Sequence, residues 1–401
     1  MKPKRSAVLL AIAFASYILL GMPNGLLGVA WPSMRQSFGL PLDALGTLLT
    51  TVTIGYILSS FNSGRLIARF GVGPLLTISS VLIGAGALGY VVAPIWWVLV
   101  ASGLLLGLGN GLVDAGLNVY VAENYDTRHM NWLHASFGIG VTLGPMIMTA
   151  MLNAGRSWRL GYVFVVALEV VLVACFVITR QRWGTPTGEA AAGADAHQPV
   201  GRASSLASLR LPLVWLGIAM FTMHVGVEFV GGQWSYTLFT EGRSITPTVA
   251  SLWTSVYWGS LTVSRLLLGS LTDRVGVDRM LRLCILGIVA GSLLLWWNVT
   301  DLVGFLGLAV IGCGVALLFP SMISSTPRWM GTAHAANAIG FQVAAGSAGV
   351  TLVPGLAGIL AERLGLEIVG PLLVISGLVM LLLFELLVRR SARQVTEGAP
   401  S

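Results

Sequence analysis

The stretch that decides the fold is Gly103–Val121, which reads GLLLGLGNGLVDAGLNVYV. It is apolar and close to the length of about 20 residues that a helix needs to cross a bilayer. Asn110, Asp114 and Asn118 are spaced four apart, so a helix places them on one face. A carboxylate at the centre of a membrane helix costs roughly 2.5–3.5 kcal/mol, so it faces a partner or a polar interior. We expect a membrane-spanning helix with a polar site; the alternative is a ladder of hydrogen bonds between packed helices.

The composition describes a chain that crosses the membrane many times. Its 401 residues are 55% hydrophobic and 10% charged, and the mean hydropathy is +0.84. Soluble proteins carry about 25% charged residues. The net charge of +7 comes almost entirely from arginines in short loops, which set topology and require no nucleic acid.

Signals for an enzyme, a metal or a cofactor are absent from the sequence. The glycines at 107–111 lie inside an apolar helix, so they do not form a dinucleotide loop. There is no phosphate-binding loop that would support ATP-driven transport. The three cysteines lie inside apolar segments and show neither disulfide nor metal spacing: Cys175, Cys284 and Cys313.

Twelve apolar segments are expected to be helices. They are 6–30, 44–68, 74–94, 97–122, 133–154, 159–180, 211–239, 248–270, 279–298, 301–325, 334–360 and 367–388. Residues 181–210 are rich in Gly, Ala, Pro and Ser, which is typical of a linker.

The basic residues predict the orientation. With the N-terminus inside, 18 of the 23 Lys and Arg residues fall on the inner side. The other five fall outside: Arg35, Arg156, Arg159, Arg243 and Arg363. This excess places both termini and the linker in the cytoplasm.

The two halves of the chain repeat one another. Three matches recur in order at offsets of 205, 205 and 209 residues: 64–71 with 269–276, 107–109 with 312–314, and 140–145 with 349–354. Ordered matches at a nearly constant offset indicate two repeats of six helices. Two parallel six-helix repeats are the plan of the major facilitator superfamily.

We therefore predict an all-α membrane protein with twelve transmembrane helices in two six-helix bundles. The predicted parts are an N-terminal bundle (1–180), a cytoplasmic linker (181–210), a C-terminal bundle (211–390) and a cytoplasmic tail (391–401). We expect a monomer in the inner membrane of a bacterium, since low lysine with high arginine, glycine and alanine is typical of a high-GC genome.

A loop motif strengthens the resemblance to this superfamily. Residues 269–276 read Gly-x-Leu-x-Asp-Arg-x-Gly, the superfamily's signature, while the copy at 64–71 has Ala68 in place of the acid. The resemblance implies that these residues form a conformational latch: Gly64, Arg69, Gly269, Asp273, Arg274 and Gly276. The N-terminal copy thus departs from the motif at the acid, and the alternative for Arg65 and Arg69 is contact with anionic lipid.

The polar face of 97–122 resembles the fucose:proton symporter family and its glucose-transporter-like relatives. The shared form is Asp114-Ala-Gly-Leu-Asn118, and residues 133–145 are also similar. The resemblance implies that Asp114 couples transport to a proton or sodium ion and that Asn118 binds a sugar. Fucose transporters have a second acid in the first helix, where this chain offers only Asn24.

A second candidate for ion coupling lies in 211–239. His224 and Glu228 are four residues apart and could share a proton. Glu228 could replace the absent acid of the first helix, because ionisable groups inside membranes are usually functional. A buried histidine with a purely structural role is the alternative for His224.

The resemblance implies that the first, fourth, seventh and tenth helices line a cavity, with the second, fifth, eighth and eleventh beside them. Amides and aromatic rings on these helices suit a sugar, which has an apolar face and a rim of hydroxyl groups. The candidate solute-binding residues are Asn24, Asn110, Asn118, His134, Gln233, Trp234, Trp258, Asn337 and Gln342. The same aromatic faces would suit a planar or cationic drug, and helix packing is the alternative for each tryptophan.

The leading function is alternating-access uptake of a small sugar-like solute, coupled to protons or sodium. The first rival is proton-driven drug or metabolite export. Exporters of the superfamily carry Gly-x-x-x-Gly-Pro-x-x-Gly-Gly, and Gly140, Gly144 and Pro145 match its first half while Met148 and Thr149 replace the last glycines. The second rival is a membrane receptor or scaffold that does not transport.

Overall fold

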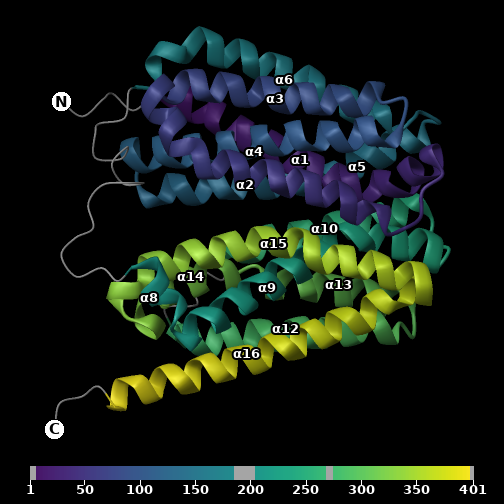
Figure 1. The fold of residues 1–401 in the computed structure, drawn as a ribbon. Coiled ribbons are helices and arrows are strands. Elements are labelled where there is room, and N and C mark those ends of the chain that lie inside the picture. The colour runs from purple at the N-terminus through teal and green to yellow at the C-terminus, as the bar shows by residue number, and fades with distance from the viewer. Residues whose placement is uncertain (1–5, 185–203, 268–273, 398–401) are drawn as a thin grey trace. The chain divides into compact units, whose positions relative to one another are not determined.

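The computed structural model describes residues 6–184, 204–267 and 274–397. Over these residues every regular element is a helix, as Figure 1 shows. The all-α fold predicted from the sequence is therefore confirmed.

Each of the twelve predicted segments contains at least one helix within the described residues. In the first half the helices are α1 (Ala7–Phe38), α2 (Ala44–Phe70), α3 (Val72–Val92), α4 (Trp96–Asn124), α5 (Thr127–Asn153), α6 (Arg159–Thr179) and η1 (Arg180–Arg182). In the second half they are α8 (Ser205–Leu209), α9 (Pro212–Thr237), η2 (Leu238–Gly242), α10 (Pro247–Leu267), α12 (Val277–Trp297), α13 (Asp301–Val315), α14 (Leu318–Met330), α15 (Thr332–Leu364), η3 (Leu366–Ile368) and α16 (Val369–Glu397).

Eleven of these segments, within the part of the chain that is described, are long and apolar enough to span a membrane. The twelfth, α10, is a 21-residue helix that carries more serine and threonine and falls below that apolar level. Several boundaries differ from expectation: α1 ends at Phe38 rather than at 30, α5 begins at Thr127 rather than at 133, and α16 runs to Glu397 rather than to 388. The segment predicted at 301–325 is two helices, α13 and α14, that extend to Met330.

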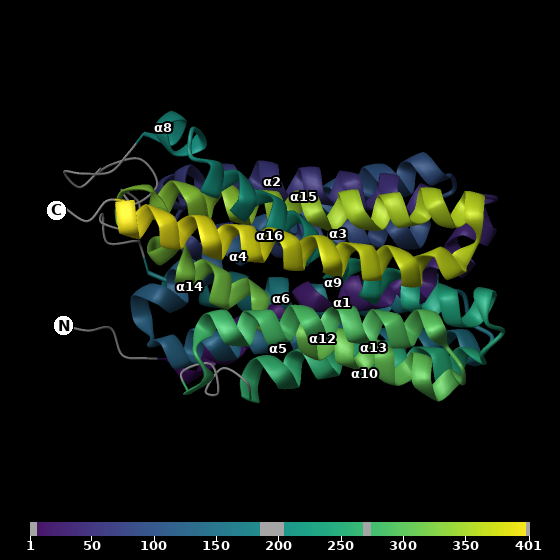
Figure 2. The ribbon, with the colours of Figure 1, turned by 90° about the horizontal axis from the view of Figure 1, so that it is seen from below.

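The chain divides into two compact units. The first contains α1 to η1 together with residues 246–255, and the second contains α8, α9, η2 and residues from 256 onward. In the first unit α1 packs on α5, while α2 and α3 pack on α4. In the second unit α9 packs on α15, and α12 lies beside α13 and α16 (Figures 1 and 2).

The helix crossings confirm the internal repeat. At Gly107 an added Cβ atom would clash with the Val52 carbonyl, and at Gly312 it would clash with the Tyr257 carbonyl. Gly312 lies 205 residues after Gly107, and Tyr257 lies 205 residues after Val52. Two more crossings keep this offset. The contact of Gly109 with Ser79 corresponds to that of Gly314 with Cys284, and the contact of Gly86 with Leu106 corresponds to that of Gly291 with Ile311. Glycine is needed at these points because the backbones approach too closely for a side chain.

The α1–α5 pair and the α9–α15 pair repeat in the same way. Gly140 faces the Ile18 carbonyl and Gly349 faces the Thr222 carbonyl, at offsets of 209 and 204 residues. Residues of the two halves can therefore be matched position by position, with an offset of 204 for α1 and 205 for α2 and α4.

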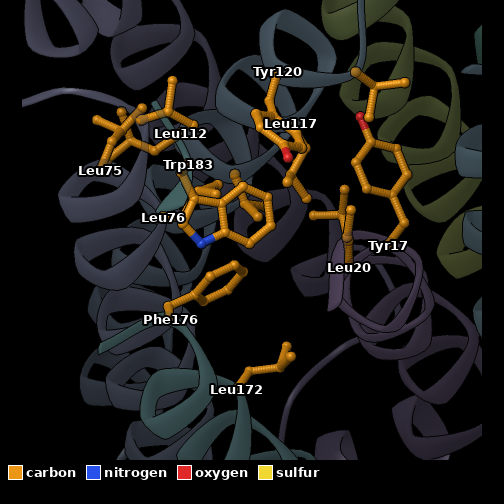
Figure 3. Close-up of a cluster of buried hydrophobic side chains, with 14 of the residues drawn as sticks. Tyr17, Leu20, Leu75, Leu76, Leu112, Leu117, Tyr120, Leu172, Phe176 and Trp183 are labelled. Atoms are coloured by element: carbon orange, nitrogen blue, oxygen red, sulfur yellow. The ribbon is translucent and has the colours of Figure 1, made fainter. Parts of the chain in front are cut away.

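The start of the expected linker is packed against the first unit. Of residues 181–210, positions 185–203 lie outside the described residues. Trp183 is 2% exposed and its ring meets Tyr120 at 4.7 Å and Phe176 at 5.5 Å between centroids (Figure 3). Its indole N–H donates to the Thr179 hydroxyl over 2.9 Å, so this residue anchors the chain after α6.

Gly291 and Gly287 lie one turn apart on α12 and provide a matched test of the crossings. A Cβ at Gly291 would come within 2.6 Å of the Gly307 carbonyl oxygen, whereas nothing lies within 4 Å of one at Gly287. Gly291→Ala should lower the thermal midpoint of the purified protein, since overpacking costs about 1–3 kcal/mol. Gly287→Ala should be neutral or stabilising, because alanine favours a helix by about 0.5–1 kcal/mol. Equal midpoints for the two variants would refute the close crossing.

Candidate functional site

Asp114 lies in a set of hydrogen bonds that joins three helices of the first unit. The Tyr17 hydroxyl from α1 donates to Oδ1 of Asp114 over 2.6 Å, and the Tyr56 hydroxyl from α2 donates to Oδ2 over 2.7 Å. The Asn118 amide from α4 donates to Oδ1 over 3.0 Å and to the Tyr17 hydroxyl over 2.8 Å. We call these four residues the Asp114 cage.

The cage satisfies the acid with uncharged donors. Hydrogen bonds to a charged group contribute about 1.5–3 kcal/mol, about twice the value between neutral groups. Tyr17 is 1% exposed, while Asp114, Asn118 and Tyr56 are half-buried. The cage is therefore a packed but reachable site on α4.

The sequence analysis identified Asp114 and Asn118 but missed both tyrosines. A carboxylate in an apolar setting needs donors, and Tyr17 and Tyr56 are the single tyrosines of α1 and α2. That requirement was the available signal.

The repeat-related positions in the second half are apolar. They are Phe221 for Tyr17, Leu261 for Tyr56, Phe319 for Asp114 and Ile323 for Asn118. Phe221 and Phe319 meet edge to face with ring centroids 5.3 Å apart, where their equivalents share a hydrogen bond. The cage therefore belongs to one repeat alone.

Three other candidates lie on helices of the first unit. The exposed His134 on α5 meets the Tyr17 ring edge to face at 5.6 Å, which brings it to the cage. Asn110, one turn before Asp114, is 7% exposed, and its Oδ1 has no hydrogen-bond partner. Asn24 is half-buried and its amide donates to the Leu20 carbonyl over 3.4 Å.

The second unit brings His224 and Glu228 together on α9. Nε2 of His224 is 3.7 Å from Oε2 of Glu228, too far for a hydrogen bond, and the His224 side chain is fully buried. The Tyr257 hydroxyl donates to the Glu228 backbone carbonyl over 2.7 Å. Arg265 on α10 lies close enough for its charge to act on both side chains.

These ionisable groups also belong to one repeat alone. Their equivalents in the first half are Leu20 for His224, Asn24 for Glu228 and Ser60 for Arg265. Each half therefore has a polar site at positions that the other half fills differently. The acid of the first half has neutral partners, whereas the acid of the second half has a cation nearby.

Four predicted solute ligands are deeply buried in the second unit. Trp234 is fully buried, and its indole N–H donates to the Pro354 carbonyl over 3.0 Å. Trp258 is 1% exposed, and its Nε1 has no hydrogen-bond partner. Gln342 accepts from the Thr326 hydroxyl over 2.9 Å, and Gln233 is also fully buried.

Asn337 of α15 forms hydrogen bonds with α8. Its amide donates to the Ser208 hydroxyl over 3.1 Å, and His334 contacts the same hydroxyl at 3.0 Å. These contacts hold the short helix at the end of the linker against α15.

The expected latch is only partly visible. Gly269 and Asp273 lie outside the described residues. Arg274 is exposed, and Gly276 has a φ of 88° where α12 begins. Arg69 is exposed, with its guanidinium 5.4 Å from the Phe70 ring centroid, and Gly64 is half-buried in α2. Among the described residues, no cluster of three or more His, Cys, Asp or Glu side chains could hold a metal ion.

Removal of a cage hydroxyl should destabilise the first unit. Tyr56→Phe and Tyr17→Phe should each lower the thermal midpoint, because a hydrogen bond to a charged group is lost. Tyr162→Phe is the matched control, since the buried Tyr162 hydroxyl has no hydrogen-bond partner and its removal should be neutral or stabilising. The cage would be contradicted by a Tyr56→Phe midpoint that equals that of Tyr162→Phe.

Several curated proteins are similar to the chain over most of its length. One is Bypass of stop codon protein 6 from Saccharomyces cerevisiae, 22% identical over 89% of this chain and 77% of that protein. Another is Sodium-dependent glucose transporter 1 from Homo sapiens, 22% identical over 87% and 73% of the two chains. A third is Multidrug resistance protein 2 from Bacillus subtilis, 22% identical over 84% and 81%.

Solved transporter structures share the fold. The nucleoside transporter NupG superposes with a TM-score of 0.75 at 14% identity, covering 95% of this chain and 99% of NupG. A D-xylose-proton symporter gives 0.74 at 15% identity, covering 93% and 96%. The fucose:proton symporter of E. coli gives 0.62 at 15% identity, covering 95% and 98%.

The sequence model of the Major Facilitator Superfamily matches residues 13–243 and 216–401. Together with the repeated helix crossings, this match shows that the chain belongs to the Major Facilitator Superfamily of membrane transporters.

Proposed function

We propose that the protein is a secondary active transporter that takes up a small sugar-like solute together with a proton or a sodium ion. The observation that carries this proposal is the Asp114 cage, an acid inside a membrane helix that is held by neutral donors from α1, α2 and α4. The names of a sodium-dependent glucose transporter and a D-xylose-proton symporter among the similar proteins support a cation-coupled sugar carrier.

The cage gives the acid a way to change the packing of three helices. When Asp114 is ionised, its two oxygens accept from Tyr17, Tyr56 and Asn118. A proton on the carboxylate would weaken these bonds, because a hydrogen bond to an ionised acceptor is roughly twice as strong as one to a neutral acceptor. A sodium ion would compete with the same donors for the two oxygens. Loading of the ion would thereby loosen one of the links between α4 and its neighbours.

The residues near the cage are the first candidates for solute contact. Asn118 and His134 offer an amide and an imidazole beside the acid, and Asn110 has a carbonyl oxygen without a partner. Such groups bind sugar hydroxyls. The buried candidates Gln233, Trp234, Trp258 and Gln342 would contact a solute only in a state that uncovers them.

Drug export is the second candidate function. The similarity to Multidrug resistance protein 2 and the half-match of the exporter motif at 140–145 favour it. Both glycines of this half-motif pack closely against α1: Gly140 lies against Ile18, and Gly144 lies against Gly25. Efflux of ethidium from loaded cells, compared with uptake of labelled D-xylose and D-glucose, separates the two functions.

We also propose that both termini face the cytoplasm of a bacterial cell, that the protein acts in the inner membrane, and that it acts as a monomer. The excess of arginine on the side of the termini supports the orientation. A cysteine introduced at Gln394 should react with a membrane-impermeant reagent only after the cells are opened.

Asp114→Asn should abolish accumulation of solute against a gradient and leave counterflow exchange in place. The variant keeps the shape of the side chain but cannot ionise, and exchange needs reorientation of the carrier without net ion movement. The measurement compares energised uptake with counterflow of labelled D-xylose and D-glucose in proteoliposomes.

Glu228→Gln is the comparison variant, and it should retain accumulation unless Glu228 shares the coupling role. If Asp114→Asn still concentrates solute in proportion to an imposed pH or sodium gradient, Asp114 is not the coupling residue and Glu228 becomes the candidate.

A further inference from the structure

The helix between Asp301 and Met330 is interrupted at residues 316–317, between α13 and α14. Pro320 lies four residues after Ala316, and proline has no N–H to donate to the carbonyl of that residue. The carbonyl of Ala316 is therefore left without its helical partner. Nε of Arg265, from α10, donates to it over 3.1 Å and takes the place of the missing N–H.

This replacement matters because the break is buried. Ala316 is fully buried and Leu317 is 3% exposed. Ala316 and Leu317 keep right-handed helical dihedrals, so the break is a missing hydrogen bond rather than a change of backbone conformation. An unpaired carbonyl in such a place costs about 1–3 kcal/mol and requires a partner inside the protein. Arg265 supplies that partner across a helix–helix contact.

The first half shows the same position without the break. By the offset of 205, Ala115 stands for Pro320, Gly111 for Ala316 and Ser60 for Arg265. Helix α4 runs unbroken from Trp96 to Asn124, since Ala115 keeps its N–H. The proline and the arginine thus occur together in one repeat and are absent together from the other.

Arg265 also connects the break to the acid of α9. Its charge acts on Glu228 and on the buried His224. On α9 the Glu228 backbone is held by Tyr257, which lies two turns before Arg265 on α10. The same side chain thus binds the backbone at the break and carries the charge that acts on His224 and Glu228.

We propose that Arg265 is a positioning residue that holds a joint between α13 and α14, and that the transport cycle uses this joint. The joint lets α14 change its direction relative to α13 while Arg265 keeps the Ala316 carbonyl paired. The proposal rests on the proposed transport function for its second part only, because the hold of Arg265 on the break is a property of the folded chain.

The hold is tested by a double-mutant cycle of Arg265→Met and Pro320→Ala. The cycle is run in a Glu228→Gln background, so that no acid is left without its nearby cation. The readout is deuterium uptake by peptides covering residues 316–324. Arg265→Met should speed exchange in this segment by about tenfold, the effect of roughly 1.4 kcal/mol of lost pairing.

Pro320→Ala gives residue 320 an N–H that can donate to the Ala316 carbonyl. In that background Arg265→Met should therefore no longer speed exchange. Pro320→Ala should also restore the yield of folded protein if Arg265→Met alone folds poorly. Exchange that rises equally in both backgrounds, or in neither, would overturn the hold. This arm needs no substrate, so its result is independent of the proposed function.

The use of the joint is tested by turnover. Pro320→Ala should lower the maximal counterflow rate for labelled D-xylose or D-glucose at least fivefold with the half-saturating concentration nearly unchanged, since it makes the helix continuous like α4. Pro327→Ala, which removes a proline one to two turns later in α14, is the matched control and should keep the wild-type rate. A wild-type rate for Pro320→Ala would show that transport does not use the joint. Failure of the wild-type protein to carry either sugar would instead count against the proposed function.

Discussion

The packing of the first unit depends most on the hydrogen bonds that stabilise the Asp114 carboxylate inside a membrane helix. Asp114 has no cation among its hydrogen-bond partners, and its two oxygens are instead covered by hydroxyl and amide donors from α1, α2 and α4. Because these donors come from three helices, the acid fixes how α1 and α2 lie against α4. An ion that binds the carboxylate would change the same contacts that define the packing, and the proposed coupling rests on this.

The internal repeat explains why the two halves differ in chemistry while sharing their backbone. The glycine crossings are preserved at constant offsets, since any side chain there would strike a carbonyl. The polar positions carry no such steric requirement and have diverged. The equivalents of the Asp114 cage are apolar, and Phe221 packs on Phe319 where Tyr17 binds Asp114. Conversely, Glu228 and Arg265 have only Asn24 and Ser60 as counterparts.

Much of the fold could be predicted from sequence because apolar length, loop arginines and repeat offsets are one-dimensional signals. The twelve segments and the repeat follow from them, and Asp114 stands out because a charge in a 20-residue apolar run is rare. The partners of that charge could not be predicted in the same way. Tyr17 and Tyr56 lie 97 and 58 residues from Asp114, and only the helix crossings bring their hydroxyls to it. Likewise, Pro320 predicts a freed carbonyl, but its replacement donor comes from Arg265 on another helix. Asn337 was predicted as a solute ligand from its residue type and from the expected place of its helix beside the cavity, and only the structure shows that its amide donates to Ser208 of α8.

The central claim, that the ion bound at Asp114 moves with the solute, is tested most directly by charge movement. Proteoliposomes on a solid-supported membrane receive a jump of D-xylose or D-glucose, and the transient current is recorded. The account predicts a current for the wild-type protein and none for Asp114→Asn, although that variant still binds the sugar and exchanges it. A current of equal size from both proteins would contradict the account.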